Sequence, residues 1–163
     1  MTATAIEPQL VTELADATRE VFRTMVFREV TEAPRTERAA VQAGANVVAT
    51  VAFAGKTSGL VAVYTTFEAA NEITAAMLGI QPADVDGELP DAIGELGNMI
   101  AGSFRTRMAA VGGETWAISV PTVVVGKDFY TKYVSDVQRV VCPFRMGPHE
   151  VLVELILTRR NGQ

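Results

Sequence analysis

The chain is poor in the side chains that most enzymes use for chemistry, with one cysteine, Cys142, and one histidine, His149, among its 163 residues. A lone cysteine cannot form an internal disulfide, and this count is typical of a reducing, cytoplasmic setting. One Cys and one His supply too few ligands for a transition-metal site, so we expect no bound metal. His149 follows Gly147 and Pro148 in a predicted turn, which excludes a hydrolase built on a nucleophile–histidine set. Cys142 lies in an apolar strand pattern and is predicted to be a core residue.

Positive charge and long apolar runs are also scarce. Lys and Arg number 14 against 19 Asp and Glu, which gives a net charge of −5 with no basic cluster, so nucleic acid is an improbable partner. No apolar run approaches the roughly 20 residues that span a bilayer, and the N-terminus lacks the pattern of a signal peptide. With 48% hydrophobic and 20% charged residues, the chain is predicted to fold as one domain over residues 1–163, with an ordered core of about 8–158.

The spacing of apolar residues predicts three helices and five strands. The helices are expected at residues 8–25, 67–78 and 90–111, and the strands at 46–54, 60–66, 116–125, 137–144 and 151–158. Thr66 is placed to cap the second helix and Gly79 to end it, while Gly112 and Gly113 follow the third. This order indicates an α+β fold, a mainly antiparallel sheet with helices packed on one face.

One short sequence imitates a nucleotide-binding loop. Residues 54–58 read A-G-K-T-S, like the end of a phosphate-binding P-loop. The glycine that this motif needs five positions earlier is replaced by Thr50, and a strand rather than a helix follows. A hairpin turn explains the segment better.

The predicted helix at 90–111 has two distinct faces at about 100° per residue. The apolar stripe, which is expected to face the core, contains Leu89, Ile93, Leu96, Ile100, Phe104, Met108 and Val111. The opposite polar face contains Asp91, Glu95, Asn98, Gly102 and Arg105. Each glycine inside a helix costs about 1 kcal/mol relative to alanine, so Gly94, Gly97 and Gly102 call for a reason such as close approach of another surface. For Gly97 and Ala101, tight packing on a neighbouring element is as good an explanation as a functional role. It explains Gly94 and Gly102 less well, because these two flank the polar face.

Glu95 and Asn98 are three residues apart and therefore point the same way from the helix. An amide can orient a water molecule for attack on a phosphoryl group, and a carboxylate can pair with a cation of a partner. Most such pairs are ordinary exposed residues, and the chain holds a second E-x-x-N at Glu68 and Asn71. We interpret that second copy as a solvated helix start.

A longer pattern includes the first pair. Asp91, Glu95, Asn98 and Pro121 match D/S-x3-E-x2-N-x22-P, whereas Tyr64 and Gly94 occupy the outer positions around the second copy. The match resembles the signature of the CheC, CheX and FliY family of chemotaxis phosphatases. A single copy on a chain of this length is most similar to CheX, and the resemblance centres on DAIGELGNMIAGSF.

The resemblance implies a phosphatase that acts on the aspartyl-phosphate of a CheY-like response regulator receiver domain. It implies that Asn98 orients the attacking water and that Glu95 pairs with a receiver lysine, with Asp91, Gly94, Gly102 and Arg105 as partner-binding residues and Pro121 in a supporting role. Mg²⁺ is then expected in the receiver and not in this chain. The resemblance also implies a homodimer. The alternatives are a non-catalytic docking module of the same fold and, with no residues in its favour, a small-ligand-binding domain.

Overall fold

The computed structural model describes residues 7–34, 45–112, 115–127 and 136–158, and its elements lie close to the predicted ones. The helices are α1 (Pro8–Val21), α2 (Phe67–Leu78) and α3 (Leu89–Gly112), with a π-helical turn at Phe22–Val26 and a 3₁₀ turn at Pro82–Asp84. The strands are β1 (Thr31–Glu32), β2 (Val47–Ala54), β3 (Gly59–Thr65), β4 (Ala117–Ile118), β5 (Thr122–Val125), β6 (Val137–Met146) and β7 (His149–Thr158). Gly113 lies outside the described residues.

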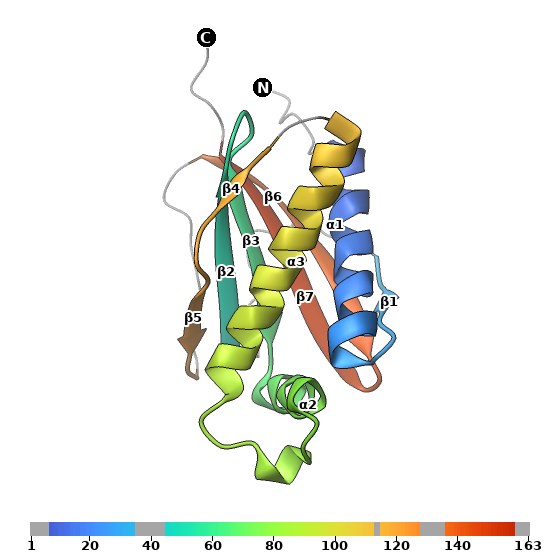
Figure 1. Ribbon diagram of the computed structural model, residues 1–163, viewed down its shortest axis with the longest axis vertical. Coiled ribbons are helices and arrows are strands. Elements are labelled where there is room, and N and C mark those ends of the chain that lie inside the picture. The colour runs from blue at the N-terminus through green and yellow to red at the C-terminus, as the bar shows by residue number, and fades with distance from the viewer. Residues whose placement is uncertain (1–6, 35–44, 113–114, 128–135, 159–163) are drawn as a thin grey trace.

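All seven strands form one antiparallel sheet in the order β1-β6-β7-β3-β2-β4, with β5 paired to β2 beside β4. Helices α1 and α3 lie side by side over one face of this sheet, and α2 lies across its end, near the start of α3 (Figure 1). The predicted α+β class is therefore confirmed. No helix in the described ranges is both long and apolar enough to cross a membrane.

Helix α2 begins and ends where local chemistry predicts. The Thr66 hydroxyl accepts a hydrogen bond from the Ala69 amide at 3.1 Å, so it satisfies one of the amides that a helix start leaves unpaired. Gly79 closes the helix in the left-handed conformation, at a φ of 69° that favours glycine. Both predictions for this helix are confirmed.

Helix α1 departs from its prediction in the last turn. The α-helix ends at Val21, and a π-helical turn continues the chain to Val26. The wider turn rotates the side chains that follow, so Val26 is fully buried whereas Met25 is 37% exposed. The expectation that a regular helix runs to Met25 is wrong for this reason.

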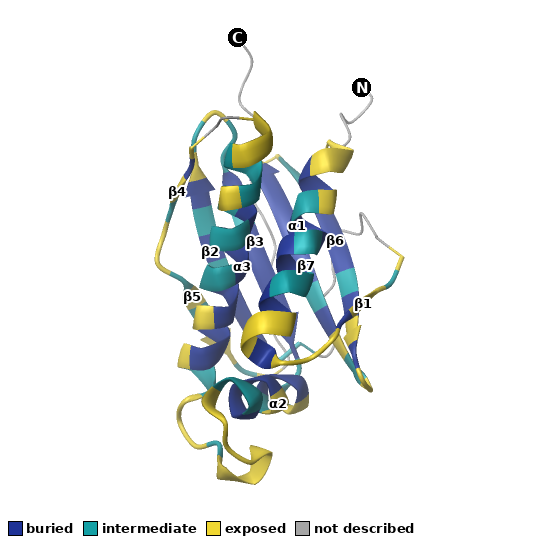
Figure 2. Ribbon diagram, turned by 45° about the vertical axis from the view of Figure 1, so that its right-hand side comes forward, coloured by how far each residue is buried: buried dark blue, intermediate teal, exposed yellow. Residues whose placement is uncertain are grey.

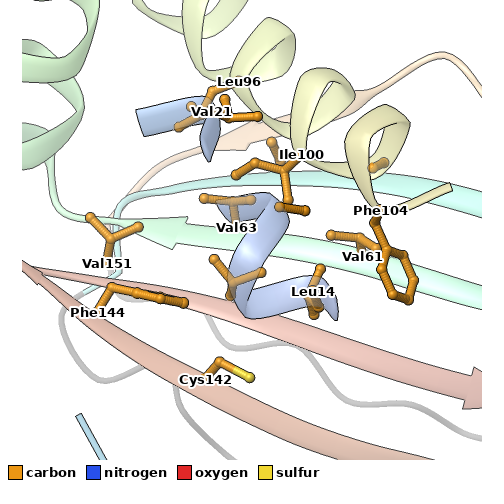
Figure 3. Packing of buried hydrophobic residues seen from close by; sticks show 14 of the residues in the cluster. Leu14, Val21, Val61, Val63, Leu96, Ile100, Phe104, Cys142, Phe144 and Val151 are labelled. Atoms are coloured by element: carbon orange, nitrogen blue, oxygen red, sulfur yellow. The ribbon is translucent and has the colours of Figure 1, made fainter. Parts of the chain in front are cut away.

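The core lies between the sheet and helices α1 and α3. Leu96, Ile100 and Phe104 of α3 point toward Val61 and Val63 of β3, as Figure 3 shows. Leu14 and Val21 of α1 lie in the same cluster, and Cys142 is buried in it as predicted. At the far end of the predicted apolar stripe of α3, Val111 is 48% exposed, because the helix extends past the residues that cover its lower turns.

Helix α3 packs directly on β2 at Gly97, which carries no side chain. A Cβ atom at Gly97 would lie 3.2 Å from the Ala49 Cβ, which is tighter than ordinary van der Waals contact. The packing explanation for Gly97 is therefore confirmed, and Ala101 beside it is buried.

A polar cluster joins α1 to α3 on their outer side. The Arg107 Nη2 donates to Glu20 Oε2 at 2.6 Å, and the Ser103 hydroxyl donates to the same oxygen at 3.2 Å. Arg107 also lies 3.7 Å from Glu13. The hydrogen bond from Arg107 is the main cause that lowers the pKa of the Glu20 carboxyl below its ordinary value. The two helices that cover the core are therefore tied together by charge as well as by apolar contact.

The sheet face opposite α1 and α3 carries a smaller apolar cluster formed by Val48, Ala62, Tyr64 and Ile156. Among these residues lies Glu154, which is fully buried. The Tyr64 hydroxyl donates to its carboxylate at 2.5 Å, and Arg139 forms an ion pair with it. A buried carboxylate needs such partners because water no longer solvates its charge.

Gly97 and Gly102 of α3 predict different effects of alanine. A Cβ atom at Gly102 would point into open space with no other part of the chain within 4 Å beyond its own stretch of helix, so Gly102→Ala should raise the free energy of unfolding by about 0.5–1 kcal/mol through helix propensity. Gly97→Ala should give no such gain, because its methyl group would press on Ala49. Urea denaturation of both variants measures the difference, and an equal gain in both would contradict close packing at Gly97.

The lowered pKa of Glu20 predicts a pH-dependent contribution to stability. A depressed carboxyl pKa stabilises the fold above the carboxyl's ordinary pKa, and this stabilisation is lost as the pH falls through the depressed value. Glu20→Gln should therefore lower the free energy of unfolding at pH 7, by less than about 1 kcal/mol for a half-exposed pair. The difference in free energy of unfolding between Glu20→Gln and the wild-type protein should disappear below about pH 4. Denaturation curves that stay equally far apart from pH 7 to pH 3 would refute this role.

Candidate functional site

The polar face of α3, formed by Asp91, Glu95, Asn98, Gly102 and Arg105, points away from the sheet. Asp91 and Glu95 are exposed, and the other three residues are half-buried. Figure 2 shows this face as the outward side of a helix whose inward side is buried. At 1.5 Å per residue the polar face extends for about 20 Å along the helix. It is carried by a regular helix anchored on the core, so its side chains start from fixed positions.

The side chains of this face are not committed to other parts of the chain. Within the described ranges, Asp91, Glu95, Asn98 and Arg105 form no side-chain hydrogen bond or ion pair. The carboxylate of Glu95 and the amide of Asn98 are therefore available to an incoming molecule. Such a pair can grip and orient a ligand, but it has no nucleophile of its own.

The second E-x-x-N sequence differs in this respect. The Asn71 Nδ2 donates to the Pro82 carbonyl oxygen at 2.8 Å, so its amide holds the 3₁₀ turn that follows α2. Glu68 is exposed in the first turn of α2. The copy at Glu68 and Asn71 thus has a structural use at Asn71, in addition to the solvated helix start that the sequence predicts.

Two of the predicted partner-binding glycines have different surroundings. Gly102 has open space over its Cα, which leaves a flat place in the middle of the polar face. Gly94 is buried, because a Cβ there would lie 3.1 Å from Val123 Cγ2 and 3.7 Å from Pro121 Cγ. A partner-binding role for Gly94 stays a prediction, and its observed contacts are within the chain. This glycine lets α3 settle onto β5.

Pro121 lies beside this contact, in a β-bulge between β4 and β5. The register pairs Phe53 with Ile118 and Thr50 with Thr122, so the two residues between Thr50 and Phe53 oppose the three residues 119–121. The prediction of one strand over 116–125 is therefore wrong, because the bulge divides it into β4 and β5. The proline itself was the signal that could have shown it, since a proline in a sheet is confined to edges and bulges.

Ser119 closes the ladder at the bulge. Its backbone N–H donates to the Ala52 carbonyl oxygen at 2.8 Å, and its hydroxyl accepts from the Ala52 N–H at 3.0 Å. The same hydroxyl lies 2.9 Å from the Val120 carbonyl oxygen, to which it can donate. Pro121, the last residue of the D/S-x3-E-x2-N-x22-P pattern, packs against Gly94 of the helix that carries the other three.

The described residues offer no protein-built metal centre. In the ranges that the structure covers, no three His, Cys, Asp or Glu side chains lie close enough together to hold a metal ion. His149 is the first residue of β7 rather than part of the preceding turn, and its Nε2 lies 3.1 Å from Glu72 Oε1. The chemistry that the polar face offers is therefore charge pairing by Glu95 and hydrogen bonding by Asn98.

A family model described as Chemotaxis phosphatase CheX matches residues 47–145, which include all four pattern residues. None of the curated proteins that were compared matches the chain.

Several solved structures share the fold. A CheC-like superfamily protein from Shewanella sp. PV-4 is 24% identical, with a TM-score of 0.83 over 94% of this chain and 100% of that one. A chemotaxis protein CheX from Desulfovibrio desulfuricans is 25% identical, with a TM-score of 0.79 over 92% of this chain and 99% of that one. A chain of the CheX–CheY–BeF₃–Mg²⁺ complex from Borrelia burgdorferi is 20% identical, with a TM-score of 0.76 over 92% of this chain and 98% of that one.

Proposed function

Since the chain belongs to the CheX family of chemotaxis phosphatases, we propose that it hydrolyses the aspartyl-phosphate of a CheY-like response regulator receiver domain. The observation that carries the proposal is the contrast between the two E-x-x-N sequences. Asn98 presents an uncommitted amide on the polar face, whereas the Asn71 amide is bonded to Pro82. The Borrelia burgdorferi structure, in which CheX is in complex with CheY, makes a receiver a reasonable partner for the same fold.

In the proposed reaction a water molecule attacks the phosphorus atom in line with the bond to the aspartate oxygen. That bond breaks as the new one forms, which releases inorganic phosphate and restores the free aspartate. The Asn98 amide both donates and accepts hydrogen bonds, so it can hold this water in the attacking orientation. Because Asn98 carries no charge and does not itself titrate, its contribution is positional.

Glu95 lies one turn before Asn98 on the polar face and carries the opposite charge to a receiver lysine. We propose that this ion pair sets the docking geometry, with Asp91 and Arg105 adding contacts farther along the helix. The Mg²⁺ of this chemistry neutralises charge on the phosphoryl group and would be held by the receiver. This chain then contributes only binding and orientation. With its net charge of −5, we expect recognition of the receiver to depend on local contacts along α3 rather than on long-range electrostatic attraction.

Removing the Asn98 amide tests the catalytic part of the proposal. With phosphorylated receiver and Mg²⁺, Asn98→Ala should lose most of the acceleration of phosphate release, about a hundredfold, with unchanged thermal unfolding. Asn71→Ala is the matched control, because it removes the same amide from the other E-x-x-N and should retain activity. Equal dephosphorylation with and without the wild-type protein, across the receivers of its organism, would refute the proposal. Binding without hydrolysis would instead favour a docking module.

Removing the Glu95 carboxylate tests the docking part. Glu95→Ala should raise the receiver concentration for half-maximal rate by about tenfold, because it deletes one partner of a charge pair at the interface. The penalty should shrink as ionic strength rises, since salt screens exposed charges. Glu68→Ala removes a carboxylate from the other copy and should behave like wild type. A docking role for Glu95 would be contradicted if Glu95→Ala lowered the maximal rate and left the receiver concentration for half-maximal rate unchanged.

A further inference from the structure

One turn of helix α3 carries both polar residues of the proposed site and both glycines that meet the sheet. Glu95 and Asn98 belong to the polar face, and Gly94 and Gly97 are buried against neighbouring strands. In an α-helix the N–H of each residue donates to the carbonyl oxygen four positions earlier, which for Asn98 is that of Gly94. A displacement of the backbone at Gly94 therefore also displaces Asn98.

The two glycines rest on a pair of side chains that lie opposite each other on neighbouring strands. A Cβ atom at Gly97 would lie 3.2 Å from the Ala49 Cβ. One at Gly94 would lie 3.1 Å from Val123 Cγ2. Ala49 of β2 and Val123 of β5 are direct partners in the register of the sheet. Of the four residues of β5, only Val123 is not exposed, and the Ala49–Val123 pair supports the helix turn from 94 to 98.

Strand β5 is held at both of its ends against movement away from the helix. Before it, the Ser119 N–H donates to the Ala52 carbonyl oxygen at 2.8 Å. After it, the Gly126 N–H donates to the Asn46 carbonyl oxygen at 2.9 Å, and Asn46 Nδ2 donates to the Gly126 carbonyl oxygen at 3.3 Å. The Asn46 Oδ1 also accepts from the N–H of Phe67, the first residue of α2, at 3.1 Å. Extra volume between strand and helix is therefore expected to move the helix turn.

A small movement of this turn affects the two polar residues differently. A methyl group at Gly94 would require a shift of a few tenths of an ångström. The Asn98 amide has to hold a water molecule in line with a breaking bond, and a misplacement of about 1 Å can cost about a hundredfold in rate. The Glu95 carboxylate pairs with a flexible lysine, and the energy of an ion pair changes only slowly with separation. The shift should therefore lower the maximal rate more than the affinity.

We infer that Gly94 is a positioning residue of the proposed phosphatase, because its contact with Val123 sets where α3 presents the Asn98 amide. The inference rests on the proposed function and names a residue that maintains its rate without contact with the substrate. Pro121 belongs to the same contact, since its Cγ lies 3.7 Å from the Cβ position of Gly94. The last residue of the D/S-x3-E-x2-N-x22-P pattern thus lies under the helix turn that carries Glu95 and Asn98.

Adding a methyl group at this contact, and then removing the atoms that it meets, tests the inference. Rates of phosphate release are measured over a range of phosphorylated receiver concentrations with Mg²⁺, and circular dichroism checks the fold of each variant. Gly94→Ala should lower the maximal rate about fivefold, with little change in the half-saturating concentration. The double variant Gly94→Ala/Val123→Ala, which lacks Val123 Cγ2, should be no slower than Val123→Ala alone, and this coupling reports the contact.

Gly112→Ala is the matched control for the added methyl group. It lies on the same helix, at the end away from Asn98, and its Cβ would meet no other part of the chain within 4 Å beyond its own stretch of helix. It should hydrolyse phosphorylated receiver like wild type.

Each other outcome has a distinct meaning. A wild-type rate in Gly94→Ala, with Asn98→Ala inactive, would overturn the inference and leave the phosphatase function standing. An equally low rate in the Gly94→Ala single and double variants, with Val123→Ala active, would also overturn it, because the loss would not arise at Val123. A raised half-saturating concentration at unchanged maximal rate would instead assign Gly94 to direct contact with the receiver. An unfolded Gly94→Ala beside a folded, fully active double variant would assign the contact to folding alone. Absence of hydrolysis by wild type would overturn the proposed function, and the inference with it.

Discussion

The architecture depends on how closely α3 approaches the sheet edge. Two glycines make this approach possible, Gly97 over Ala49 of β2 and Gly94 over Val123 of β5. A side chain at either position would lift the helix, and the apolar residues between α3 and β3 would then no longer fill their space. The same contact presses Pro121 against the helix. The orientation of the polar face is thus a consequence of backbone packing beneath it.

The proposed function needs this arrangement, because in it the partner supplies the reactive groups. A helix anchored on a core holds an amide and a carboxylate more firmly than a loop does, and positioning demands such firmness. The scarcity of cysteine and histidine is then no obstacle to activity in this family. Chemistry that is divided between two proteins occurs only when both are docked, so recognition and rate depend on the same surface.

Local signals were sufficient for much of the fold. The ends of α2 follow from Thr66 and Gly79, and the hairpin of β2 and β3 from two β-branched runs, because each depends on residues close in sequence. The polar face was also predictable, since helical periodicity alone defines it. Burial of Gly94 was not, because it depends on Val123, 29 residues away. The π-helical turn that buries Val26 instead of Met25 also depends on packing against other elements, so no local sequence signal predicts it.

The connectivity of the sheet has a consequence for how the chain matures during synthesis. Helix α1 is made first, yet it packs against α3 and against β6 and β7, which are made last (Figure 1). Its apolar side, which includes Leu14 and Val21, therefore stays partly uncovered until the hairpin of β6 and β7 has left the ribosome. Such long sequence separation slows folding and leaves the nascent helix exposed to association with other chains. Helix α1 therefore completes its packing only after α3, β6 and β7 have been made.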